Sequence, residues 1–203
     1  MKRSRLFILL AILFAALIAA AFVAGRRYCP SAGLAVTQQT RDFYRLKNRT
    51  APPQLADFDT TVTLESLLLP GEDSARWSSS RAARVEGYVV SVAAGPLELT
   101  NCYVPGRRDT HIHIGRHRDS PPSEQVVLET TPRMEDWATD QGWDWSAVSL
   151  YNKLLGRRVR FEGWLFFDTS HASESENLAP GRRGNWRATA WEIHPVTKFE
   201  IIE

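Results

Sequence analysis

Two histidines separated by a single residue form the clearest metal-ligand pattern in the sequence. His111 and His113 lie in the segment 109–116, DTHIHIGR, where they alternate with Ile112 and Ile114. Side chains two residues apart on a strand project from the same face, so both imidazoles could reach one divalent metal ion, the only cofactor the sequence offers. Solvent-facing histidines are also common on strands, and no spacing such as HExxH supports a site. A third ligand would come from His117, His171, His194, Asp168 or Glu129.

A second candidate site is a row of aromatic side chains. In residues 156–168, GRRVRFEGWLFFD, Trp164 and Phe166 alternate with an apolar series that would face the core. OB folds bind ligands on the outer face of their central strands, with aromatic rings as stacking platforms. In the alternative interpretation, residues 58–69 or the loop 171–185 cover this pair. Further members of the proposed face are Trp186, Arg187 and Trp191.

Catalytic motifs are absent from the sequence. It contains neither a GxSxG nucleophile motif nor a GxxxxGK phosphate-binding loop. Several carboxylates could serve as acid and base, but no two of them are marked out by an apolar setting. The sequence therefore favours a binding protein over an enzyme. The carboxylates considered are Asp168, Glu174, Glu176 and Glu192.

The elements that must position these residues follow the order β-β-β-α-β-β. Helical spacing of apolar residues predicts one helix over 144–155, directly before the strand at 156–168, and residues 133–142 read as a polar connection. The pattern predicts a mainly β chain folded as a small OB-like barrel, in which Pro195 marks a bulge or an edge. The other strands are expected at 84–92, 109–116, 125–132 and 186–202.

Several of these segments resemble a group of exported bacterial OB-fold-like proteins of unassigned function. The resemblance rests on VEGYVVSV, RDTHIHI, LLGRRVRFEGWLFFD and NWRATAWEIHPVTKFEI, and covers residues 58–202. It implies an OB-like domain outside the cytoplasm, but no activity. A membrane anchor followed by an external OB domain is also similar to the arrangement in periplasmic haem chaperones. Their C-terminal tail with a haem-attaching histidine and a nearby tyrosine is missing here, since only Glu203 follows the last strand.

The N-terminal residues predict a single membrane anchor. Residues 6–25 are twenty uncharged, mostly apolar residues, about the length that spans a bilayer. An export signal is the alternative. We expect residues 1–5 in the cytoplasm, a stalk over 26–57, and an external domain over 58–203. This arrangement corresponds to a single-pass protein of the bacterial inner membrane with its domain on the periplasmic side.

The distribution of charge bears on nucleic-acid binding, and the two cysteines bear on a possible disulfide. Residues 77–203 hold 15 basic against 17 acidic residues, and the preceding residues 10 against 6, so the excess positive charge lies near the membrane. Nucleic-acid-binding OB domains need a basic groove, so this balance disfavours a third hypothesis, nucleic-acid binding. Cys29 and Cys102 could form one disulfide or remain free thiols.

These observations favour a membrane-anchored binding or assembly module of the cell envelope. Its partners would be the membrane, through the N-terminal helix, and either envelope proteins or a small ligand. A metal-binding protein or metal-dependent enzyme that uses His111 and His113 is the alternative.

Overall fold

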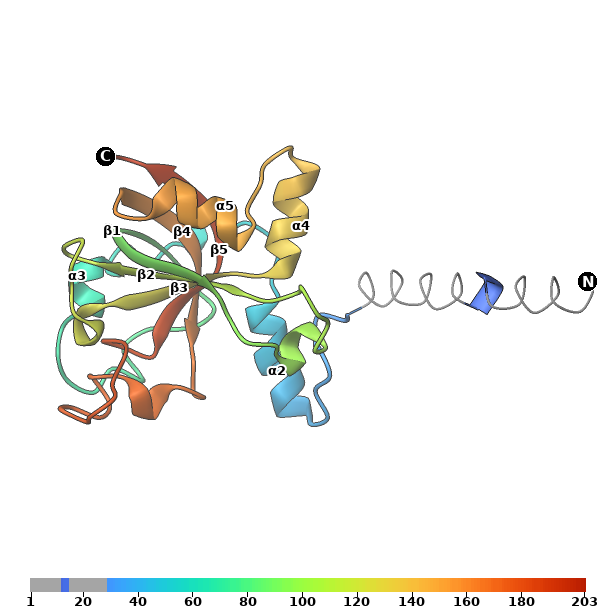
Figure 1. The fold of residues 1–203 in the computed structure, drawn as a ribbon. Helices are drawn as coiled ribbons and strands as arrows, with labels where there is room; N and C mark the ends of the chain where they lie inside the picture. Colours follow the sequence, from blue (N-terminus) through green and yellow to red (C-terminus); the bar gives the residue numbers. More distant parts are fainter. Residues whose placement is uncertain (1–11, 15–28) are drawn as a thin grey trace, which may run out of the picture.

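The computed structural model describes residues 12–14 and 29–203 (Figure 1). The strands are β1 (Ala82–Ala94), β2 (Thr110–Gly115), β3 (Val126–Thr130), β4 (Arg158–Phe167) and β5 (Trp191–Ile201). The α-helices are α2 (Gln38–Lys47), α3 (Leu64–Leu67), α4 (Pro132–Asp140) and α5 (Ala147–Leu154). Short 3-10 turns are η1 (Leu55–Asp57), η2 (Leu99–Asn101), η3 (Pro122–Glu124) and η4 (Ala172–Glu174).

The five strands close into a barrel in the order β1-β2-β3-β5-β4. Neighbouring strands are antiparallel except β3 and β5, which run parallel with Leu128 opposite Ile193. The prediction of a small, mainly β barrel is confirmed, and the closed five-stranded barrel is consistent with an OB-like fold.

Strand β4 lies between β1 and β5 and carries much of the core. Val159, Phe161 and Leu165 are completely buried, as the alternation in the sequence predicts. Phe161 is paired with Val85 on one neighbouring strand and with Phe199 on the other. A contact of this kind on both sides makes Phe161 central to the barrel.

The close approach of β4 to β5 depends on a glycine. A Cβ atom at Gly163 would lie 2.3 Å from the carbonyl oxygen of Pro195, so a larger residue would push the strands apart. The register shifts on both sides of Gly163, which confirms the predicted bulge at Pro195.

Two helices rather than one connect β3 to β4. The helix α5 confirms the segment predicted over 144–155. The prediction of a polar connection over 133–142 was wrong, because α4 lies there. Its first turn is fixed by Thr131, whose hydroxyl accepts a hydrogen bond from the Met134 N–H, and by Pro132. Met134 and Ala138, one turn apart, provide the buried face that the sparse apolar residues did not reveal.

The N-terminal segment 29–57 packs against the barrel, although the sequence reads as a stalk there. A disulfide joins Cys29 to Cys102. The side-chain amide of Asn48, directly after α2, donates hydrogen bonds to the carbonyl groups of Ser31 and Thr100. Figure 1 shows α2 beside the η2 region. The packed unit therefore includes residues 29–57, upstream of the predicted boundary at residue 58.

The predicted anchor, residues 6–25, lies outside the described residues except for 12–14. Among the residues that the structure describes, no helix combines the length and the apolar character needed to cross a membrane.

Candidate functional site

Three neighbouring strands bring a carboxylate and two histidines together on the outside of the barrel. His111 of β2 is paired with Glu129 of β3, and the Leu128–Ile193 pair places His194 of β5 beside Glu129. Leu128 and Ile193 point into the core, so the residues that follow them point to the opposite face.

These residues and Asp109 form a group that we call the buried acid–histidine site: Asp109, His111, Glu129 and His194. Glu129 Oε1 lies 3.3 Å from His111 Nε2, and Glu129 Oε2 lies 3.1 Å from His194 Nδ1. Asp109 Oδ2 lies 3.9 Å from His194 Nε2. Asp109, Glu129 and His194 are at most 2% exposed, so these groups interact largely without water.

A second group of charges supports the site from the side of β5. Arg187 donates a hydrogen bond of 2.7 Å to Glu192, and both side chains are completely buried. Glu192 in turn lies 3.3 Å from His194 Nδ1. On its other side Arg187 lies 3.8 Å from Asp168, which pairs with His171 at 2.6 Å. This chain of partners fixes the orientation of His194.

The helix α2 covers the site with a lysine. Lys47 Nζ lies 3.3 Å from Glu98 and 4.0 Å from Asp109 Oδ2. The other oxygen of Asp109 accepts a hydrogen bond of 2.9 Å from Asn101. Burial alone would lower the pKa of Lys47, but the surrounding carboxylates, Glu129 and Asp109 foremost, raise it.

The same competition between burial and charge sets the protonation of the site. Burial lowers the pKa of His194, but Glu129 and Glu192 outweigh it and raise this pKa to about 9. Burial raises the pKa of Asp109. For Glu129, burial is outweighed by His194 and His111, which hold its pKa well below the usual range. Without a bound ion, His194 is therefore a cation held between carboxylates.

The predicted histidine pair is divided in the structure. His113 Nδ1 lies 3.0 Å from the amide oxygen of Gln125, and its ring lies 5.7 Å from that of Trp186. Burial lowers the pKa of His113 to about 4. His111 lies beside Glu129, and Glu129 in turn lies beside His194. The sequence offered both Glu129 and His194 as third ligands, while His113 is held apart by its own neighbours.

Asp109 was not singled out from the sequence, although a signal for it exists. Asp109 precedes His111 by two residues, and Glu192 precedes His194 by two. Both acid-x-histidine pairs belong to strand segments, where this spacing puts the two side chains on one face.

The aromatic face predicted on β4 is largely covered, and α2 covers it. Phe166 is 1% exposed, with its ring 4.8 Å from Phe43 and 5.4 Å from His194. Trp164 is partly exposed, donates a hydrogen bond to the Ala51 carbonyl group and lies under the guanidinium of Arg49. Neither of the covering segments considered from the sequence contains these contacts.

The remaining members of the predicted face do not extend it. Trp191 is buried, and its indole nitrogen donates to the carbonyl group of Asp73. Trp186 donates to Glu174, and its ring lies 4.0 Å from the guanidinium carbon of the buried Arg187. These residues are bound within the domain and do not form one open platform.

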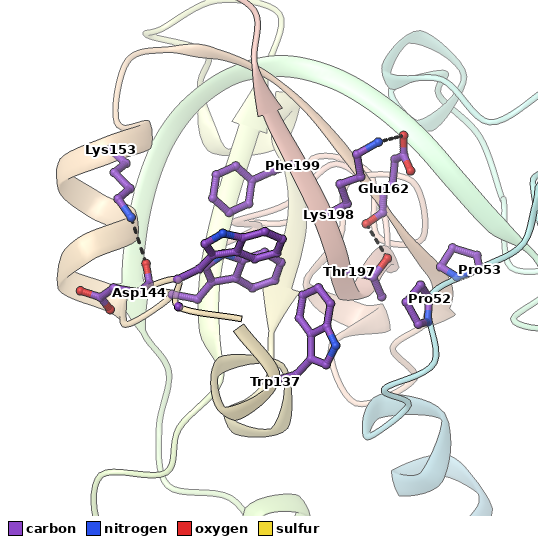
Figure 2. Close-up of a pocket in the computed structure, with 12 residues that line it drawn as sticks. Pro52, Pro53, Trp137, Asp144, Lys153, Glu162, Thr197, Lys198 and Phe199 are labelled. Atoms are coloured by element: carbon purple, nitrogen blue, oxygen red, sulfur yellow. Dashed lines mark hydrogen bonds and ion pairs between the residues drawn. The ribbon is translucent and has the colours of Figure 1, made fainter. Parts of the chain in front are cut away.

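An aromatic cavity lies elsewhere, between α4, α5 and β5, and we call it the tryptophan pocket (Figure 2). Its volume is about 700 Å³. Three rings, Trp137, Trp143 and Trp145, pack with centroids 5.6 to 6.5 Å apart, and Phe199 lies 5.2 Å from Trp145. The aromatic residues lining the pocket are Trp137, Trp143, Trp145 and Phe199.

Prolines and paired charges complete the pocket. Figure 2 shows Pro52 and Pro53 at its border, on the side away from Lys153. Lys153 donates a hydrogen bond to the carbonyl oxygen of Asp144, and Lys198 lies 3.5 Å from Glu162. Trp143 is 52% exposed, so its ring is accessible from solvent.

This pocket could not be predicted from the sequence, because its walls come from segments far apart in the chain. Three tryptophans within residues 137–145 are the one local pattern that could have indicated an aromatic pocket. No protein-family model and no curated protein matches this chain, so its function has to be inferred from the geometry of these two sites.

Proposed function

We propose that this chain is a membrane-anchored binding or assembly module of the cell envelope, and that its tryptophan pocket holds an extended, proline-containing segment of another envelope protein. The observation that carries the proposal is the cavity of about 700 Å³ walled by three indole rings. Ligand pockets of this size are mostly apolar, with a few polar groups that fix orientation.

The chemistry of the walls favours a proline-containing peptide. Such peptides form polyproline II helices, which leave their carbonyl groups without internal hydrogen bonds and dock into aromatic grooves. Among the described residues, the indole N–H groups of Trp137 and Trp143 donate to no other group. They are therefore available to a ligand's carbonyl oxygens.

The chain itself offers an internal comparison. Pro52 and Pro53 line the pocket, and they continue into Gln54, whose backbone is extended at φ −86° and ψ 165°. This border therefore already accommodates two consecutive prolines followed by an extended residue. Two acidic and two basic side chains line the pocket, Asp144, Glu162, Lys153 and Lys198, so it has no net charge that would select a strongly charged ligand.

The basic side chains of the barrel argue against the nucleic-acid hypothesis. Arg160 lies within 3.0 Å of Glu86 and of Glu200, and Arg84 lies 2.9 Å from Glu162. Guanidinium groups paired in this way are not free to neutralise phosphates.

Binding of decaproline to the full-length protein tests the pocket by isothermal titration calorimetry. The wild type should bind, and Trp143→Ala should weaken binding by about tenfold or more. Truncation of a tryptophan at the centre of an interface commonly costs about 2 kcal/mol or more of binding free energy. Trp143 is half exposed, so its loss should leave the fold intact.

Tyr151→Ala is the matched control, since Tyr151 on α5 is 46% exposed and does not line the pocket. Its affinity for decaproline should equal that of the wild type. Binding of chitotriose in place of decaproline, with the same dependence on Trp143, would reassign the pocket to a saccharide. Equal affinities of Trp143→Ala and Tyr151→Ala for decaproline would mean that the pocket is not the binding site.

The anchor is the second part of the proposal. Residues 6–25 have the length and composition of a membrane span, with residues 1–5 inside. The Cys29–Cys102 disulfide supports a domain on the oxidising, external side, because such bonds are rare in the cytosol. An OB-like barrel that presents a binding pocket suits this location.

A reporter fusion tests the topology. Alkaline phosphatase, which requires an oxidising compartment, should be active when fused after the exposed Glu203, and the full-length chain should remain in membranes after washing with high salt. Activity of a reporter that functions only in the cytoplasm, fused at the same residue, would contradict the proposed orientation.

A further inference from the structure

We propose that Asp109, Glu129 and His194, with His111 at their edge, bind one divalent metal ion of the zinc or manganese type. The site is separate from the tryptophan pocket, so this proposal does not rest on the proposed function. One ligand atom from each of Asp109, Glu129 and His194 lies within 4.8 Å of the other two. Nitrogen and oxygen ligands bind zinc at about 2.0 to 2.2 Å, so small side-chain rotations would close the three around an ion.

Unsatisfied polar atoms provide an independent observation. Asp109 Oδ2, Glu129 Oε2 and His194 Nε2 are buried and make no hydrogen bond. Asp109 Oδ2 lies 3.9 Å from His194 Nε2, whereas Glu129 Oε2 lies 3.1 Å from Nδ1 of the same ring. His111 Nε2 is in the same state. A buried polar atom left without a hydrogen bond is unfavourable, and four that lie together indicate a missing common partner. A metal ion held by Asp109, Glu129 and His194 would be the partner that these three side chains lack, with His111 beside Glu129 at the edge of the site.

The remaining atoms of these side chains are oriented as metal ligands usually are. Asp109 uses its other oxygen to accept from Asn101, which leaves Oδ2 for the ion. Nδ1 of His194 faces both Glu129, at 3.1 Å, and Glu192, at 3.3 Å, which leaves Nε2 on the side of Asp109, and Glu192 is itself held by Arg187. A carboxylate behind a ligating histidine fixes the ring and its tautomer.

The buried charges of the site can accommodate a divalent cation. The buried side chains around the site include four carboxylates, from Asp109, Glu129, Asp168 and Glu192. They include two permanent cations, Lys47 and Arg187. When a metal ion replaces the proton on His194, the imidazoles are neutral and two negative charges remain, which one divalent ion compensates.

The ligand set and the burial indicate the kind of ion and its role. Imidazole together with carboxylate suits zinc and manganese, whereas magnesium and calcium prefer oxygen ligands alone. The site is closed by α2 through Lys47, and a surface cavity of about 240 Å³ lined by Lys47, Asp168 and His171 lies beside it. A closed site of this kind is typical of a structural metal, which here would join β2, β3 and β5.

Zinc titration of the full-length protein, after treatment with EDTA, tests the proposal. The wild type should bind one Zn²⁺ per chain and melt at a higher temperature with zinc than without. Glu129→Gln, which keeps the shape and removes the charge, should lower the zinc affinity by more than about 100-fold, beyond the effect typical of outer partners of metal ligands. His113→Gln is the control on the same strand and should bind as the wild type does.

A second measurement covers the case in which Glu129→Gln does not fold. His111 is at the edge of the site and is partly exposed, so His111→Gln should fold. Its Co²⁺-loaded form should differ from the wild type in the visible d–d bands, while that of His113→Gln should not. Absence of stoichiometric metal in the wild type, or equal effects of His111→Gln and His113→Gln, would overturn the proposal.

Discussion

Phe161→Ala is expected to destabilise the domain by about 3 to 5 kcal/mol, the cost typical of removing a buried phenylalanine ring. Phe161 is fully buried on β4 and is paired with Val85 and Phe199 on the two flanking strands. Because the total stability of a domain is only about 5 to 15 kcal/mol, the variant should be close to unfolding. Urea denaturation of the full-length protein, followed by circular dichroism, measures the difference.

Trp164→Ala, three residues along the same strand, is the comparison. Trp164 is partly exposed and would lose one hydrogen bond to Ala51 and the contact with Arg49, so the expected cost is about 1 to 2 kcal/mol. Equal losses in the two variants would mean that the contacts made by the N-terminal segment are as important as the barrel core.

Arg187→Met is expected to cost about 3 to 5 kcal/mol, because it leaves the carboxylate of Glu192 buried without its main partner. Both side chains are completely buried, and their separation is 2.7 Å. Methionine keeps the volume of the side chain, so the loss reports the charge and not a cavity. Denaturation in the presence of EDTA keeps any bound metal out of the comparison.

A double-mutant cycle separates the pair from its surroundings. Arg187→Met combined with Glu192→Gln removes both charges and should cost clearly less than the sum of the two single changes. Additive costs would show that Arg187 and Glu192 are not coupled, and that other neighbours, such as Asp168 and His194, balance each of them separately.

The barrel strands could be predicted from the sequence because their information is local. A period of two in residues 156–168 determines which side chains of β4 face the core, and Val159, Phe161 and Leu165 are all buried as expected. The helix α5 has an equally clear period. In contrast, α4 places only a few apolar residues on its buried face, and the polar residues around them concealed it.

The sites could be predicted only in part, because they depend on pairing between strands far apart in the sequence. His111 was found through its spacing, but its neighbours are set by the register of β2, β3 and β5, which no local pattern encodes. The cover over Phe166 was missed for a similar reason. The helix α2 is mostly polar, and its role depends on a few contacts, such as that of Phe43 with Phe166.

The disulfide between Cys29 and Cys102 has a consequence for the connectivity of the chain. It closes residues 29 to 102 into a covalent ring that includes α2, α3 and β1. A protease that cuts this ring once, for example at the exposed Leu55 or Leu69, leaves both fragments joined. Only a reducing agent would then separate α2 from the strand that follows, so the protein tolerates a break in its backbone where a chain without the bond would lose its N-terminal cover.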